Sequence, residues 1–185
     1  MKFCSNLILF LLSYLLFLGT YSEATVYTVS STADDGTSGT LRYALLNAVA
    51  GDTVSFSSGL NGTITIGSSS TYQTALPYLT GVTILGNGNT ISGTSTYPVF
   101  FAYSGSSTIS NLNLQNGLGR GGVGGVGSGG GGGGLGAGGA LFICPGATVT
   151  TSNVAFSTNS VIGGNGGNGT SGNSMGGGGG GGLYS

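Results

Sequence analysis

The chain has very little charge, and it has no histidine and no tryptophan. Its 185 residues include three Lys or Arg and four Asp or Glu, which gives a formal net charge of −1. Without histidine, neither a Ser/His/Asp triad nor a Cys/His pair can form. Without clustered Lys and Arg, nucleic acid and anionic lipid are not expected as partners. Disordered chains are usually highly charged and poor in β-branched and aromatic residues, so the recurrence of Val, Ile, Thr, Phe and Tyr favours a folded chain.

Carboxylates are scarce, which weighs against polysaccharide cleavage. Beyond the N-terminal leader the acidic residues are Asp34, Asp35 and Asp52. Glycoside hydrolysis generally needs two carboxylates across the scissile bond, and a lyase needs acidic calcium ligands and a base. We interpret the adjacent Asp pair as a locally hydrogen-bonded turn and Asp52 as a helix-to-strand corner. We therefore expect no enzyme activity, and no catalytic, cofactor-binding or metal-ligating residues.

The two cationic residues beyond the N-terminal leader are arginines, and we expect them in different surroundings. Arg42 is expected on the exposed face of a helix or over the Asp-rich start of that helix. Arg120 is expected in a glycine loop without a partner. Calcium-binding glycine nonapeptides need an Asp in each repeat, and the glycine-rich residues 117–139 contain none.

Cysteine is almost absent, which excludes a disulfide framework. Cys4 lies in the N-terminal leader, and Cys144 is the one cysteine after it. A single thiol forms no internal disulfide, and no histidine is present to activate it. Because Cys144 lies in an apolar segment, we interpret it as a small buried hydrophobic residue.

Residues 1–24 are typical of a signal peptide. Lys2 precedes the apolar run 7–18, which is shorter than the roughly 20 residues of a membrane span. Small residues at Ser22 and Ala24 favour cleavage near Thr25. We therefore expect export, with the product secreted or exposed at the cell surface or outer membrane. A retained N-terminal anchor is the alternative.

Glycine is abundant, and many of its 42 copies fall in two stretches, 117–139 and 163–182. Elsewhere, short segments alternate apolar residues with Thr, Ser or Asn, as strands with one buried face do. Stacked asparagines are expected in the turns between them. The expected strands are 25–30, 52–56, 62–66, 81–85, 89–93, 98–103, 107–114, 140–150 and 152–156.

One helix is expected, over 39–50. An apolar stripe that begins at Leu41 recurs at helical spacing. Ser38 or Thr40 can cap its start, and Gly51 stands where a left-handed stop is needed.

Two segments repeat one another at an offset of 42 residues. The segment 108–116 matches 150–158, and Thr151 then falls at the position of Ile109. Without residues 119–139 the offset falls to half. The first glycine stretch therefore behaves as an insertion at a turn, which chains tolerate because loop-closure entropy grows slowly with length.

Shorter offsets extend the repeat. They align 62–66 with 81–85, which matches Ile64 to Ile84, and 82–86 with 107–111. A variable period of about 20–25 residues, with short strands in each unit, is typical of a parallel β-solenoid. The second glycine stretch starts at the corresponding place in its unit. Both stretches are therefore expected to project on one side, as polyproline II or as flexible chain.

Four blocks resemble a known family. They read TADDGTSGTLRYALLNAVAGDTVSFSSGLNGTITI, LTGVTILGNGNTISG, STISNLNLQNG and GGGGLGAGGALFICPGATVTTSNVAFSTNS. Together they resemble the N-terminal region of bacterial secreted right-handed β-helix proteins, which include autotransporter-type adhesins and polymorphic outer-membrane proteins. The resemblance covers about 25–185. It implies a pectate-lyase-like β-helix, export across the inner membrane, and surface display or release. Such adhesins usually have many more coils and a C-terminal membrane anchor, so this chain is expected to be a fragment.

The fold class expected from these features is all-β: a right-handed parallel β-helix with an N-terminal capping helix and Gly-rich loop insertions. Residues 1–24 form the signal peptide and 25–185 the β-helix segment. Within that segment, 25–51 form the N-terminal cap, and 117–139 and 163–182 form the Gly-rich loops. The expected core is Leu41, Leu45, Val54, Phe56, Ile64, Ile84, Ile91, Phe100, Ile109, Leu112, Leu114, Leu141, Ile143, Val149, Val154 and Phe156.

The expected function is that of a non-catalytic, adhesin-like passenger. Its partner would be a host or matrix surface, protein or glycan, and the uncapped end of the solenoid invites self-association. Contact with a membrane would come only through the missing C-terminal anchor. Three alternatives remain: a polysaccharide-acting β-helix enzyme, a glycine-rich structural protein of a wall or matrix, and, from the Thr rows, an ice-binding surface.

Overall fold

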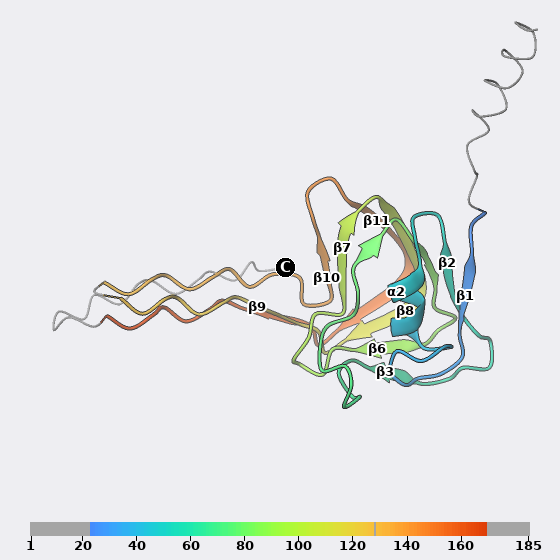
Figure 1. Ribbon diagram of the computed structural model, residues 1–185, viewed down its shortest axis with the longest axis horizontal. Helices are drawn as coiled ribbons and strands as arrows, with labels where there is room; N and C mark the ends of the chain where they lie inside the picture. The colour runs from blue at the N-terminus through green and yellow to red at the C-terminus, as the bar shows by residue number, and fades with distance from the viewer. Residues whose placement is uncertain (1–22, 128, 170–185) are drawn as a thin grey trace, which may run out of the picture.

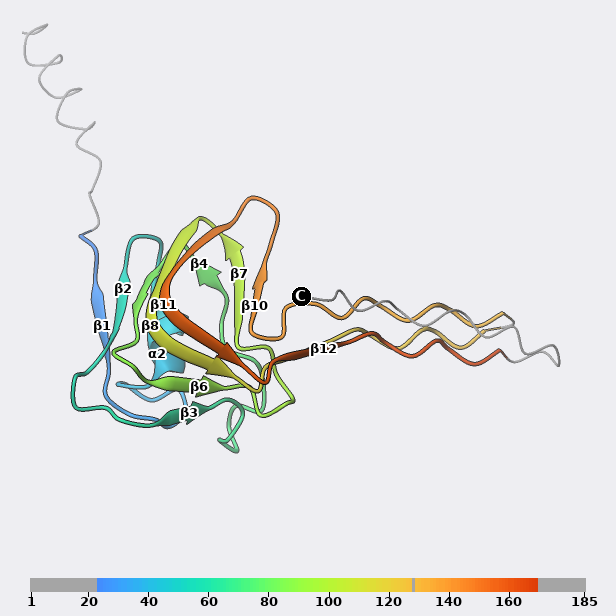
Figure 2. The same ribbon diagram turned by 180° about the vertical axis from the view of Figure 1, so that it is seen from behind.

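The computed structural model describes residues 23–127 and 129–169. Most of the predicted signal peptide and the end of the second glycine stretch lie outside the described residues. The described chain is an all-β fold of parallel strands with one short helix, which confirms the predicted class at that level. It has two parts (Figures 1 and 2): the body, residues 23–116 and 140–159, and a long projecting arm, residues 117–139 and 160–169.

The strands form three parallel sheets. The largest has the order β1-β2-β5-β8-β6-β3, with β11 on the free side of β8; the second has the order β10-β7-β4; and β12 pairs with β9 at the base of the arm. The strands are β1 (Val26–Val29), β2 (Thr53–Phe56), β3 (Thr63–Thr65), β4 (Leu79–Thr80), β5 (Thr83–Leu85), β6 (Thr90–Ser92), β7 (Phe100–Ser104), β8 (Ser106–Gln115), β9 (Leu118–Arg120), β10 (Leu141–Ile143), β11 (Thr148–Ser157) and β12 (Ser160–Ile162).

Apolar side chains of successive strands form columns inside the body. Val54, Ile84 and Ile109 occupy paired positions on β2, β5 and β8, and all three are fully buried. Side chains alternate between the two faces of a strand, so the Thr and Ser residues between them face outward. The columns are the core that the alternating sequence predicted.

Helix α2 (Leu41–Asn47) covers the β1 and β2 end of the body. The Thr40 hydroxyl accepts a hydrogen bond from the Tyr43 amide, which confirms Thr40 as the N-cap. The helix ends earlier than the predicted 39–50, because Ala48 is already extended. Gly51 is left-handed, with φ of 95°, but it lies in the turn after the helix.

Asparagines in left-handed conformation form a corner shared by neighbouring layers. Asn87, Asn111 and Asn153 have φ between 48° and 53°. The Asn153 side-chain amide donates to the Asn111 side-chain oxygen at 2.7 Å, which confirms the predicted stacking of asparagines. Asparagine tolerates this conformation better than most residues.

A single register runs from β8 into the arm. Ser106 pairs with Thr148, Leu118 with Ser160, and Gly127 with Gly169, each at an offset of 42 residues. The predicted repeat, including Thr151 opposite Ile109, is therefore confirmed. The pairing of β5 with β8 likewise confirms the match of 82–86 with 107–111.

Other predictions were wrong. Ile64 pairs with Ile91 rather than aligning with Ile84. Strands β4, β9 and β12 were not predicted, and the predicted strand 140–150 is interrupted by the turn at Pro145 and Gly146.

The predicted core fails at its last layer. Ile143 is 44% exposed and Phe156 is 51% exposed, although both lie at inward positions above Ala102 and Leu114. Within the described residues no further strand lies on β10 or β11. One side of the Ile143 side chain and one side of the Phe156 ring are therefore exposed to solvent. Cys144 is half-buried rather than buried for the same reason.

We expect Leu114→Ala to lower the free energy of unfolding by about 2–5 kcal/mol, because it leaves a cavity in a fully buried column. Phe156→Ala, in the same column, should cost only about 1 kcal/mol because the ring is half exposed. Chemical denaturation of the two variants gives both values. Equal losses would mean that Phe156 is covered in solution.

Candidate binding surfaces

Asp34 and Arg42 form a buried ion pair in which two of the three guanidinium nitrogens bind the carboxylate. Arg42 Nε donates to Asp34 Oδ1 and Arg42 Nη2 to Asp34 Oδ2, each at 2.8 Å. Asp34 also accepts from the Gly67 amide, and Arg42 donates to the carbonyls of Thr74 and Ala75. Arg42 thus lies over the Asp-rich start of the helix, and its predicted exposed position is wrong. The pair fastens the loop before β4 to the helix.

The other two carboxylates also bind protein groups. Asp35 accepts from the amide and hydroxyl of Thr37, which lowers the pKa of this exposed side chain. Stability from these bonds is present above the ordinary pKa and is lost as the pH falls through the lowered value. Asp52 accepts from the amides of Thr25 and Val49. The predicted turn role is confirmed for Asp35 and the corner role for Asp52, but the turn role is wrong for Asp34, whose partners are Arg42 and Gly67. In the described ranges no group of three His, Cys, Asp or Glu side chains could hold a metal ion.

Four aromatic side chains form a row on the outer face of the β10-β7-β4 sheet. Ring centroids are 5.9 Å apart for Tyr103 and Tyr78, 4.9 Å for Tyr78 and Phe101, and 5.0 Å for Phe101 and Phe142. The two tyrosines are about 60% exposed. We call these four residues the aromatic row.

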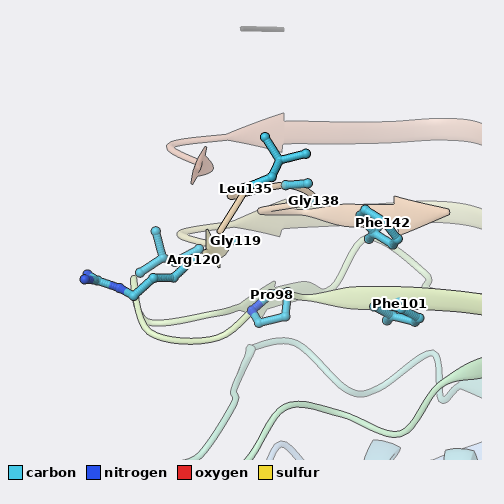
Figure 3. A pocket seen from close by; sticks show the side chains of 9 residues that line it. Pro98, Phe101, Gly119, Arg120, Leu135, Gly138 and Phe142 are labelled. Atoms are coloured by element: carbon cyan, nitrogen blue, oxygen red, sulfur yellow. The ribbon is translucent and has the colours of Figure 1, made fainter. Parts of the chain in front are cut away.

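A hollow of about 250 Å³ lies where the aromatic row meets the base of the arm (Figure 3). Phe101 and Phe142 line it from the body, and Leu135 lines it from the arm. Arg120 also borders the hollow, but its guanidinium points away from the rings. The walls are therefore mostly apolar, and a glycine-rich segment of this chain already packs against the row.

The arm consists of three legs: the first leg runs outward over 119–127, the second returns over 130–139, and the third runs outward over 160–169. Hydrogen bonds of 2.7–3.3 Å join the legs at every third residue. A spacing of three residues is the repeat of polyproline II, whereas a β-ladder repeats every two. The bonds run from the amides of Gly121, Gly124 and Gly127 to Ile162, Asn165 and Asn168, from Gly164 and Gly167 to Gly134 and Gly131, and from Gly134 and Gly131 to Gly122 and Gly125.

Glycine is required where the legs touch. A Cβ on Gly121 would collide with the Gly134 carbonyl, and a Cβ on Gly164 with the Gly122 carbonyl. The space beside Gly122 and Gly125 is open. At Gly121 and Gly164 the legs therefore approach within a distance that only hydrogen allows, which explains the glycine at those positions.

The other ridge of the first leg points outward. Arg120, Val123 and Val126 follow at three-residue spacing, and the two valines are 75% and 70% exposed. Arg120, at the start of this ridge, is also exposed. The arm thus presents an ordered apolar edge. The sequence analysis had left open whether the glycine stretches form polyproline II or flexible chain.

The sequence analysis missed the aromatic row. Its signal was the alternation in 98–103, where Phe100 and Ala102 face inward and Phe101 and Tyr103 face outward. The matching outward rings of Tyr78 and Phe142 could be assigned only after the pairing of β7 with β4 and β10 was known.

Comparisons with family models, curated proteins and solved structures found no match to this chain. In the described ranges, no helix has the length and apolar character to cross a membrane.

We expect Asp34→Asn to destabilise the body by about 3–5 kcal/mol, because the change leaves a buried guanidinium without its counter-charge. Asp35→Asn is the matched control, since that side chain is exposed and should matter far less. Denaturant titration compares the two, and similar midpoints would contradict the structural role of the pair.

Gly164→Ala should open the arm, because overpacking of this kind costs about 1–3 kcal/mol. Gly122→Ala adds the same methyl group in open space and should leave the arm intact. Amide hydrogen exchange of the arm glycines is the measurement. Unchanged protection in Gly164→Ala would contradict the three-leg packing.

Proposed function

We propose that the body is a right-handed parallel β-helix and that the chain is a non-catalytic, secreted or surface-exposed attachment protein of the adhesin type. Exclusively parallel pairing, inward columns and a capping helix at one end support the architecture. The resemblance to autotransporter passengers and the predicted signal peptide support export.

The observation that carries the attachment function is the pair of exposed apolar surfaces, one on the body and one on the arm. The aromatic row and the valine edge of the arm project from a body whose three aspartates are engaged in structural hydrogen bonds. Solvent-exposed apolar patches on a folded protein are typical of interaction sites. Tyrosine rings offer both a hydroxyl and a flat apolar face, which suits a glycan or a protein surface of a host or matrix.

The uncovered last layer supports self-association as a second property. Within the described residues no strand pairs with the free edge of β11, which has the half-exposed ring of Phe156 and no charged side chain. Uncharged strand edges of this length readily pair with another chain. We propose end-to-end contact between two copies through β11.

Attachment is tested by incubating the purified chain with insoluble cellulose, chitin, pectin gel and collagen-coated plates. We expect retention on at least one of these materials, with no release of reducing ends or unsaturated uronides. Retention should fall in Tyr78→Ser/Tyr103→Ser and persist in the control Leu46→Ser/Val49→Ser, whose residues are similarly exposed but do not belong to the aromatic row.

Two results would contradict the proposal. Released sugar products that disappear in Asp35→Asn would favour the polysaccharide-acting enzyme. Absence of retention on every material would favour a glycine-rich structural protein.

A further inference from the structure

The arm and the aromatic row have complementary chemistry. Polyproline II segments are commonly recognised by aromatic-lined grooves, because the helix is already extended and loses little entropy on binding. This chain has both halves: a polyproline II arm with exposed valines, and a row of exposed rings. We propose that the arm of one copy docks on the aromatic row of a second copy.

The packing within one copy provides a precedent. Gly138 lies so close to Phe142 that a Cβ on Gly138 would collide with the Phe142 side chain. Leu135 shares the hollow with Phe101 and Phe142 (Figure 3). A returning glycine leg therefore already lies against one end of the row, and a second copy's leg would extend this contact along the exposed tyrosines.

The spacing of the two surfaces also agrees. Val123 and Val126 are one turn apart, about 9 Å along a polyproline II helix. Centroid steps of 4.9 and 5.0 Å place Tyr78 and Phe142 no more than about 10 Å apart. One valine can therefore contact each end of this three-ring segment.

Charge and direction favour a second copy as the occupant. None of the four row residues and neither valine is charged, and the formal net charge of the chain is only −1, so repulsion between copies is weak. The first leg extends away from the body (Figures 1 and 2), and among its residues Gly119 and Arg120 line the hollow at the row whereas the valines do not. We therefore assign the two halves of the contact to different molecules. Such a contact closes into a ring or continues as a chain, as its rotation dictates.

Sedimentation velocity of the full chain over a wide concentration range tests the contact. We expect concentration-dependent association, weakened about tenfold or more by Val123→Ser/Val126→Ser and equally by Tyr78→Ser/Tyr103→Ser. Leu46→Ser/Val49→Ser should associate as the unchanged chain does. Gly164→Ala should also lose association, because it opens the arm, whereas Gly122→Ala should keep it.

Mixing the two defective variants gives the sharpest test. One has an intact row and the other an intact arm, so an equimolar mixture should associate more strongly than either variant does alone, because any contact through β11 is common to both variants. A monomer at every concentration overturns the proposal. Association that survives both double variants but is lost in Phe156→Ser also overturns it, and assigns the contact to the β11 edge.

Discussion

In-register parallel pairing is the constraint on which the rest of this structure depends. The offset of 42 residues that pairs β8 with β11 continues through β9 and β12 to Gly127 and Gly169. In the body this register stacks apolar side chains into columns. In the arm it brings two backbones together at the same level, where only glycine fits. One alignment therefore produces two different packings, and the side chains at each position decide which one forms.

The aromatic row, one of the two proposed binding surfaces, reaches the place where these two packings meet. Aromatic rings occur on the outer face because the inner face of β7 is occupied by Phe100 and Ala102. The arm leaves the body beside that face, so its base borders the hollow with Phe101 and Phe142. The ion pair of Asp34 and Arg42 acts elsewhere: it holds the loop before β4, the strand that follows Tyr78. Binding and stability thus depend on separate residues, which allows either to be altered alone.

Much of the fold could be predicted from local pattern. The alternation of apolar and polar residues predicted the strands that contain Val54, Ile84 and Ile109. Helical spacing of apolar residues, together with the cap at Thr40, predicted α2. Which strand pairs with which was harder to predict from the sequence. The segment around Ile64 resembles several others, and only the packing shows that Ile64 pairs with Ile91. The short strand β4 has two residues, too few to show a period. Exposure of Phe156 could not be predicted either, since an inward position is buried only when another layer covers it.

The sequence by itself determined the alternation, the repeat, the helix cap and the near absence of charge, because each follows from the chemistry of neighbouring residues. It also determined that glycine recurs, but not that the glycine at every third position of the first leg faces another leg. Tertiary structure decided that point, since the need for hydrogen in place of Cβ arises only when the Gly134 carbonyl lies against Gly121. It likewise decided the aromatic row, because Tyr78, Phe101 and Phe142 are far apart in the chain and become neighbours through strand pairing alone.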